Sequence, residues 1–131
     1  MKFIIIPIIA SVISQLIKII IEFIKYKKLT LTRLIDGMGG MPSTHSTLVS
    51  SLSTIIYINY GISPIFAITL IFSLVIIYDS MGIRYESGKQ AEVMNDIAGT
   101  NLEEKLGHKP IEVLIGTIIG IVLTIIIELL V

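Results

Sequence analysis

Long runs of apolar residues dominate the chain and predict its helices. Runs rich in Ile, Leu and Val cover residues 3–24 and 109–131, and each is long enough to cross ~30 Å of hydrocarbon as a helix. A third run covers 62–80, and a fourth segment, 43–60, is rich in Ser and Thr in its first half and apolar in its second. Backbone polar groups inside lipid must be satisfied internally, which favours helices over isolated strands. The pattern predicts an all-α integral membrane bundle of about four transmembrane helices.

The polar positions gather in two connections, 25–41 and 81–108, which leave the bundle on the same side. Of the 10 Lys and Arg residues, all but Lys2 and Lys18 lie in these connections or directly at their ends. An excess of Lys and Arg marks the cytoplasmic side of a membrane protein. We therefore expect both connections in the cytoplasm and both chain termini outside.

Composition supports one membrane domain and removes several other classes of protein. The chain has 131 residues, room for one domain, and 53% of them are hydrophobic. The mean hydropathy of +0.91 exceeds what a soluble core uses. A formal net charge of +0 argues against a nucleic-acid partner, and the chain has no cysteine to form disulfides. The first run has the basic start of a signal peptide, but it is too long and lacks a small-residue cleavage site.

Both histidines lie at expected helix starts on the charged side. In "GGMPSTHS", Gly39 and Gly40 allow a tight turn, Pro42 suits the first helical position, and His45 follows. In "LGHKPIEVLIG", His108 directly precedes the last helix. Helix N-termini present free N–H groups and a partial positive charge, which attract anions. The two starts together predict an anion site near one membrane surface.

The other two helices bring charged residues to the same side by their C-terminal ends. The first carries a stripe at spacings of three and four residues: Gln15, Lys18, Glu22 and Lys25. The third ends at Asp79, and Arg84 follows in "YDSMGIRYESG". Ionisable residues inside a membrane protein are functional-site candidates by default. We expect these groups to meet the histidines at one depth.

Several of these residues also have a purely structural interpretation. Lys18 and Glu22 can form a buried ion pair, and a histidine at a helix start is often only a cap. Gly116 and Gly120 form a GxxxG pattern that indicates a close helix contact. The remaining hydroxyl residues of the second helix are expected to hold helices together: Ser50, Ser51, Ser53 and Thr54.

Three motifs in order make the chain resemble a known superfamily. "PSTH" resembles the Pro-Ser-Gly-His motif of the type 2 phosphatidic acid phosphatase superfamily, and "GHKPIEVLIGTIIG" resembles its last motif. The match is closer to a divergent branch, small membrane proteins related to acid phosphatases and vanadium haloperoxidases. That branch carries "GGMPSSHS", "YDxxGxRxxxG" and "LGHxxxxVxxG", and the present chain reads "GGMPSTHS", "YDSMGIRYESG" and "LGHKPIEVLIG".

The resemblance implies roles for individual residues. It implies that His108 attacks phosphorus, that Glu112 orients and charges its imidazole, and that His45 protonates the leaving group. Ser43 and the helix-start amides would hold phosphate oxygens. No metal or other cofactor is implied, and the expected partner is a lipid phosphate drawn from the surrounding membrane lipids.

The chain also departs from the superfamily. The superfamily's first motif, a Lys followed after six residues by Arg-Pro, does not occur, and Leu102 replaces the arginine expected before His108. Phosphoryl transfer needs cations on the phosphate oxygens, so substitutes are expected, and the candidates are Lys18, Arg84 and Lys105. Arg84 is preferred because its planar fork suits phosphate. Related membrane enzymes usually have six helices, so we expect a homodimer here.

The sequence therefore favours a membrane phosphatase for a lipid or isoprenoid phosphate, acting through a phosphohistidine. A phospholipid-binding or transport protein with the same anion pocket is an alternative. A metal-dependent hydrolase is another, with a histidine and four acidic residues as ligands: Asp79, Glu86, Glu92 and Asp96.

Overall fold

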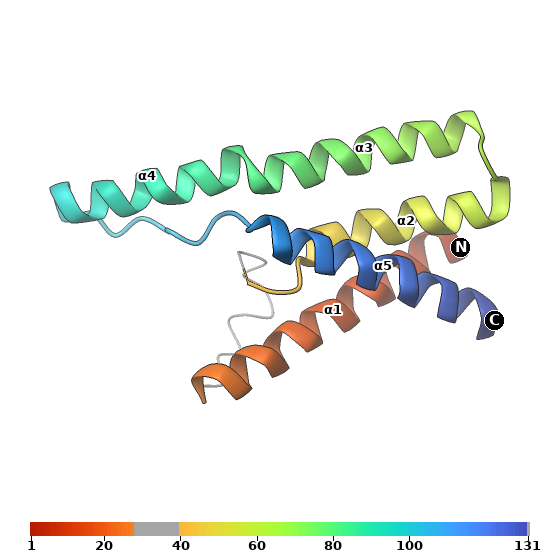
Figure 1. The fold of residues 1–131 in the computed structure, drawn as a ribbon, viewed down its shortest axis with the longest axis horizontal. Coiled ribbons are helices and arrows are strands. Elements are labelled where there is room, and N and C mark those ends of the chain that lie inside the picture. The colour runs from red at the N-terminus through yellow and green to blue at the C-terminus, as the bar shows by residue number, and fades with distance from the viewer. Residues whose placement is uncertain (28–39, 131) are drawn as a thin grey trace.

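The computed structural model describes residues 1–27 and 40–130, and all regular secondary structure in this part of the chain is α-helix. The helices are α1 (Lys2–Tyr26), α2 (Thr44–Tyr60), α3 (Pro64–Met81), α4 (Ile83–Ala98) and α5 (Pro110–Leu130). Both termini lie at the same end of the bundle as the turn between α2 and α3 (Figure 1). The expected all-α bundle is confirmed.

Helix α2 is the centre of the bundle and packs against α1, α3 and α5. Its contact with α5 depends on two glycines. A Cβ atom on Gly116 would lie 2.4 Å from the Ser43 carbonyl oxygen, and one on Gly120 would lie 2.1 Å from Ser50 Oγ. Only glycine permits this approach, so the close contact predicted from the GxxxG pattern is confirmed.

Buried hydroxyl groups join α2 to its neighbours. The Ser51 hydroxyl lies 2.5 Å from Thr124 Oγ1 on α5, and the Ser53 hydroxyl lies 2.8 Å from Ser73 Oγ on α3. The Ser50 and Thr54 hydroxyls instead donate to carbonyl groups of α2 itself. The predicted role as helix-joining groups is therefore confirmed for Ser51 and Ser53, while Ser50 meets α5 by packing against Gly120 rather than by a hydrogen bond.

Two boundaries differ from the sequence-based prediction. Helix α2 does not begin at Pro42, because the extended Ser43 is its N-cap and accepts a hydrogen bond from the Ser46 amide. The segment 81–108 is not a continuous loop, because α4 occupies Ile83–Ala98. Polar residues predominate in α4, so the hydropathy pattern gave no sign of it. Helices α3 and α4 meet at Gly82 and lie almost end to end (Figure 1).

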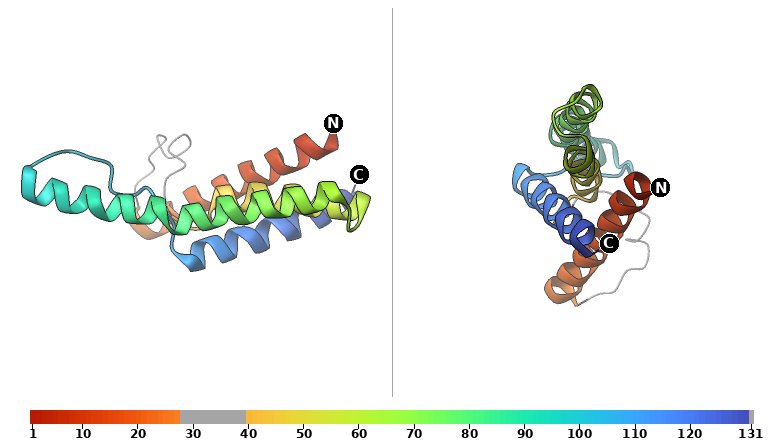
Figure 2. Two further views of the ribbon diagram at one scale, coloured as in Figure 1. Left: turned by 90° about the horizontal axis from the view of Figure 1, so that it is seen from above. Right: turned by 90° about the vertical axis from the view of Figure 1, so that its right-hand side faces the viewer.

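Three helical stretches of the described chain are long and apolar enough to cross a membrane: Lys2–Lys25, Pro64–Ala98 and Pro110–Leu130. Helix α2 has only 17 residues and a hydroxyl-rich first half, so it is not long and apolar enough by the same criterion. It nevertheless lies among the three membrane-spanning stretches. The 35-residue stretch of α3 and α4 is about 52 Å long, longer than ~30 Å of hydrocarbon. Helix α4 accordingly extends beyond the ends of α2 and α5 (Figure 2).

Candidate active site at the starts of α2 and α5

His108 is held in place by its backbone and by its ring. Its N–H donates to the carbonyl oxygen of Ser80 near the end of α3, at 3.0 Å. Its Nδ1 lies 3.2 Å from Glu112 Oε2, one turn along the chain, and only 3% of its surface is exposed. The predicted contact between His108 and Glu112 is therefore present. It fixes the ring and leaves Nε2 as the nitrogen not held by the carboxylate.

Glu112 also has a structural role that the sequence analysis missed. The same Oε2 accepts a hydrogen bond from the Lys109 backbone N–H at 3.1 Å. Since α5 begins at Pro110, Glu112 is the third helical residue, from which an acidic side chain commonly reaches back to the N-cap N–H. One carboxylate oxygen thus caps α5 and orients His108.

His45 lies at the second helical position of α2, beside His108. The two ring centroids are 6.4 Å apart, with an angle of 61° between the ring planes. Its Nδ1 is buried and has no hydrogen-bond partner within residues 1–27 and 40–130. The structure therefore brings together the two histidines that the motifs predicted to act together.

Two of the three predicted cations lie near these rings. Lys18 of α1 is 1% exposed and close enough to interact electrostatically with both histidines. Arg84 interacts electrostatically with His45, and its Nε donates to Asp79 Oδ2 at 2.7 Å. The Arg84 side chain is 45% exposed. Lys105, by contrast, is an exposed residue, and no described contact joins its side chain to either histidine.

The segment that leads into α2 packs against α1 beside Lys18. Gly40 has a φ of +83°, and a Cβ there would lie 3.1 Å from Glu22 Oε1 and 3.6 Å from Lys18 Cδ. The buried Ser43 donates its backbone N–H to the Glu112 carbonyl at 3.1 Å. Its hydroxyl oxygen accepts from Ser46, so Ser43 is the helix cap whatever else it binds. Gly39 lies outside the described residues.

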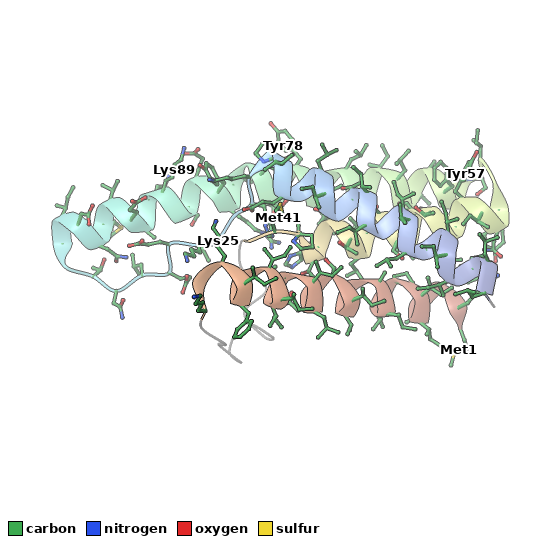
Figure 3. All side chains as sticks on the ribbon, turned by 60° about the horizontal axis from the view of Figure 1, so that its bottom comes forward. Met1, Lys25, Met41, Tyr57, Tyr78 and Lys89 are labelled. Carbon is green, nitrogen blue, oxygen red and sulfur yellow. The ribbon has the colours of Figure 1, made fainter. Side chains whose placement is uncertain are left out.

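In Figure 3, Met41 marks this lead-in segment, which lies beside the beginning of α5, and Tyr57 marks the opposite end of the bundle. We call the group formed by Lys18, His45, Arg84, His108 and Glu112 the histidine cluster. It gathers residues from α1, α2, α4 and the start of α5 at one end of the bundle.

Burial lowers the pKa of His108 below the ordinary histidine value of 6.5. The positive charge of Lys18 lowers this pKa further. The hydrogen bond to Glu112 raises it, and the Glu112 charge and a hydrogen bond with the Gly40 backbone raise it less strongly. The net result is a lower pKa, so the ring is neutral at pH 7. A neutral imidazole is the form that can act as a nucleophile.

Two glycines hold the segment before His108 against α4, and sequence reasoning did not find this function for them. A Cβ on Gly88 would lie 2.2 Å from the Glu104 carbonyl oxygen, and one on Gly107 would lie 2.3 Å from Tyr85 Cα. Both glycines belong to the quoted motifs, but the contact could not be predicted while 81–108 was read as a loop.

Asn95 is a second anchor of this segment that the sequence analysis missed. Its Nδ2 donates to the Leu102 carbonyl and to Glu104 Oε1, at 2.9 and 2.8 Å. Its Oδ1 accepts from the Thr100 hydroxyl and the Leu102 amide, at 2.7 and 2.8 Å. The side chain thus uses its full hydrogen-bonding capacity on the segment that leads from α4 to α5, residues 99–109.

The residues proposed for a metal-dependent site do not come together. Within residues 1–27 and 40–130, no group of three His, Asp or Glu side chains is placed to hold a metal ion. Asp79 pairs with Arg84 and Glu86 pairs with Lys89 instead. The described residues therefore do not support the metal-dependent alternative.

Comparisons with known proteins agree with the motif resemblance. A family model described as the Divergent PAP2 family matches residues 1–123. The chain is 35% identical to the uncharacterized membrane protein YuiD of Bacillus subtilis (strain 168), over 89% of this chain and 87% of that protein. No solved structure matches the chain.

Proposed function

Because the chain belongs to the Divergent PAP2 family, we propose that this multi-pass membrane protein is a phosphatase for a lipid or isoprenoid phosphate. The hydrolysis proceeds through a phosphohistidine on His108. The observation that carries this proposal is the pair formed by the buried His108 and the partly buried Glu112, 3.2 Å apart, beside the ring of His45. This is the arrangement of a nucleophile, its orienting acid and a proton donor.

In the first step, His108 Nε2 attacks phosphorus and the bond from phosphorus to the leaving oxygen breaks. The leaving alkoxide takes a proton from His45, and Glu112 stabilises the positive charge that develops on the His108 ring. In the second step, water attacks the phosphohistidine, and the now neutral His45 accepts the proton of that water. Phosphate leaves, and both rings return to their starting forms.

Two cations and the starts of two helices support phosphate binding at this place. Lys18 and Arg84 supply positive charge beside the rings, in place of the motif cations that the chain lacks. Of the two, Arg84 offers a fork of donors, and its partial exposure allows it to exchange Asp79 for a phosphate. The N-termini of α2 and α5 add their partial charges.

The proposal also includes an orientation, with the histidine cluster on the cytoplasmic side. The excess of Lys and Arg in the two polar connections supports it. In intact cells, a cysteine in place of Lys89 should resist a membrane-impermeant thiol reagent, and a cysteine in place of Ser63 should be labelled. The reverse labelling pattern would put the cluster outside.

A homodimer is a further part of the proposal, because the related membrane enzymes usually have six helices and three described stretches of this chain are long and apolar enough to cross a membrane. Cross-linking of the purified protein at low detergent should give a dimer. A monomer at every protein concentration would remove this part of the proposal without affecting the chemistry.

Purified protein assayed against a panel of lipid phosphates tests the activity itself. We expect phosphate release that is insensitive to a chelator and inhibited by vanadate. If lipid phosphates bind and none is hydrolysed, the chain is instead a binding or transport protein with an anion pocket. Activity that requires a divalent ion would contradict the phosphohistidine mechanism.

A further inference from the structure

A groove runs along the bundle between α3 and α5, with α2 as its floor. Helices α3 and α5 both pack against α2 but have little contact with each other, and the space between them is about 500 Å³. Leu74 and Ile77 form one wall, and Ile121 and Ile125 form the other. Because both walls belong to stretches able to span a membrane, the groove lies at the depth of lipid chains.

The groove contains serine and threonine hydroxyls, whose protons are already engaged with the protein. Ser53 and Ser73 are hydrogen-bonded to each other. The hydroxyls of Ser50, Thr54 and Thr117 each donate to a backbone carbonyl of their own helix, at 3.2, 2.7 and 2.9 Å. A polar ligand would find no unused donor on these side chains, so the groove favours a hydrocarbon occupant.

One end of the groove lies next to the histidine cluster. Thr117 is little more than one helical turn beyond Glu112, and Ile77 is one turn before Ser80, whose carbonyl holds the His108 backbone. The other end is lined by Tyr57 and Phe66, whose ring centroids are 5.1 Å apart. In Figure 3, Tyr57 lies far from the beginning of α5.

We propose that this groove binds one hydrocarbon chain of the lipid phosphate whose head group occupies the histidine cluster. This inference rests on the proposed function for the identity of the head group. From Thr117 to Ile125, α5 rises about 12 Å, which sets the length of chain that the groove receives. A helix of a second copy, about 10 Å across, would need roughly 900 Å³ over that length and would not seat in the groove.

The groove selects by shape and length rather than by hydrophobic attraction. A chain that moves from the bilayer into the groove exchanges one apolar environment for another, so little hydrophobic free energy is gained. The bilayer and the groove differ in packing, because the groove holds the chain against fixed side chains. A groove already filled by a larger side chain could not make these contacts with a lipid chain. Single-chain phosphates of matching length are therefore preferred over longer chains.

The test uses alkyl phosphates of increasing length that carry a photoreactive diazirine at the chain end. They are cross-linked to the purified full-length protein, and the adducts are mapped by mass spectrometry. Ile121→Trp fills the groove, and Ile118→Trp is its matched control, since Ile118 also lies on α5 but does not line the groove. Both variants are first checked for unchanged thermal unfolding.

We expect adducts on residues of α3 and α5 that line the groove in the wild type and in His108→Ala. Ile121→Trp should lower their yield by about fivefold or more, and Ile118→Trp should not. Adducts outside the groove, or equal yields in the two variants, would overturn the inference even if phosphate is released. Groove adducts without any hydrolysis would uphold the inference for a bound lipid phosphate and count against the phosphatase. If Ile121→Trp dissociates a dimer and leaves labelling unchanged, the groove is an interface between copies, and the inference fails.

Discussion

The two ends of the bundle both carry charged residues, but in opposite surroundings. At the end with the termini, Lys2 Nζ pairs with Glu128 Oε1 at 2.5 Å, and Asn59 adds a longer bond of 3.3 Å. The Lys2 side chain is 42% exposed there. At the other end, Lys18 is 1% exposed and His108 is 3% exposed, in one cluster with a carboxylate.

The difference separates a structural contact from a site. An ion pair in which one partner is half exposed, as Lys2 is beside the 18% exposed Glu128, contributes little, because water can also serve the exposed partner. Burying ionisable groups is expensive, and it is found where a protein needs their chemistry. The pair of Lys2 and Glu128 joins the ends of α1 and α5, whereas the histidine cluster has the groups that the proposed reaction requires.

The largest effect is expected from His108→Ala. Without the nucleophile no covalent intermediate forms, so turnover should fall by at least about 10⁴-fold on every substrate. Phosphate release from lipid and aryl phosphates provides the measurement. Glu128→Gln at the opposite end is the control and should retain nearly full activity. Similar losses in both variants would mean that the two ends do not differ in function.

His45→Ala should slow hydrolysis by an amount that depends on the leaving group of the substrate. Loss of a general acid typically costs about 10²–10⁴-fold, and the loss is felt most by a poor alkoxide leaving group. An activated aryl phosphate needs little protonation and should keep much more of its rate. The ratio of the two rates is the measurement, and an equal loss on both substrates would take the proton-donor role away from His45.

Glu112→Gln should show how much of the role of Glu112 lies in orienting the His108 ring and how much lies in its negative charge. A glutamine has one carbonyl oxygen that can accept from both the Lys109 amide and the His108 ring, so the cap of α5 is kept and the melting temperature should change little. The rate should fall by about 10²-fold, because the charge that stabilises the imidazolium is gone.

The same variant has a pH signature. Glu112 raises the pKa of His108 against the effect of burial, so its removal should lower that pKa further. Activity that requires neutral His108 is lost as pH falls through this pKa, below 6.5 in the wild type. The acid limb of kcat/KM should therefore move to lower pH in Glu112→Gln. An unchanged limb with a lower melting temperature would indicate a capping role alone.

Arg84→Ala should weaken vanadate inhibition by about tenfold, the cost of one hydrogen-bonded cation on an anion. Arg84→Lys should restore little, because an ammonium lacks the guanidinium fork. Lys89→Ala is the matched control, since Lys89 lies on α4 as well and is exposed beside Glu86. Equal inhibition of Arg84→Ala and the wild type would leave Lys18 as the phosphate-binding cation.

The smallest effect is expected from Lys2→Ala. Breaking the partly exposed pair with Glu128 should change the free energy of unfolding by about 1 kcal/mol or less. Thermal unfolding in detergent provides the measurement, with activity followed in parallel. A loss of activity without a loss of stability would show that this end also takes part in the reaction.

The sequence predicted the parts of the molecule that follow from local pattern. Apolar runs gave the membrane helices, and the motifs named the histidines and Glu112 that the structure brings together. Helix α4 was missed because its polar composition gives no membrane signal. The contacts of Gly88 and Gly107 were missed because they join segments whose proximity only the folded chain determines.

The start of α2 is a second case in which residue preferences read from the local sequence were not sufficient. Pro42 suits a first helical position by its missing N–H. Ser43 is nevertheless the N-cap residue, since its hydroxyl oxygen accepts a hydrogen bond from the Ser46 N–H. Its own backbone N–H donates to the Glu112 carbonyl. The second of these bonds links α2 to α5, and no pattern within "GGMPSTHS" contains it.

The central claim is that His108 becomes phosphorylated, and trapping the intermediate tests it most directly. Purified wild-type protein is mixed with a lipid phosphate, quenched in alkali to preserve a phosphoramidate bond, and digested for mass spectrometry. The account predicts a phosphate on the peptide that contains His108, increased in His45→Ala with an aryl phosphate and absent in His108→Ala. Phosphate release by the wild type with no phosphopeptide in any variant, or with the phosphate on another residue, would contradict it.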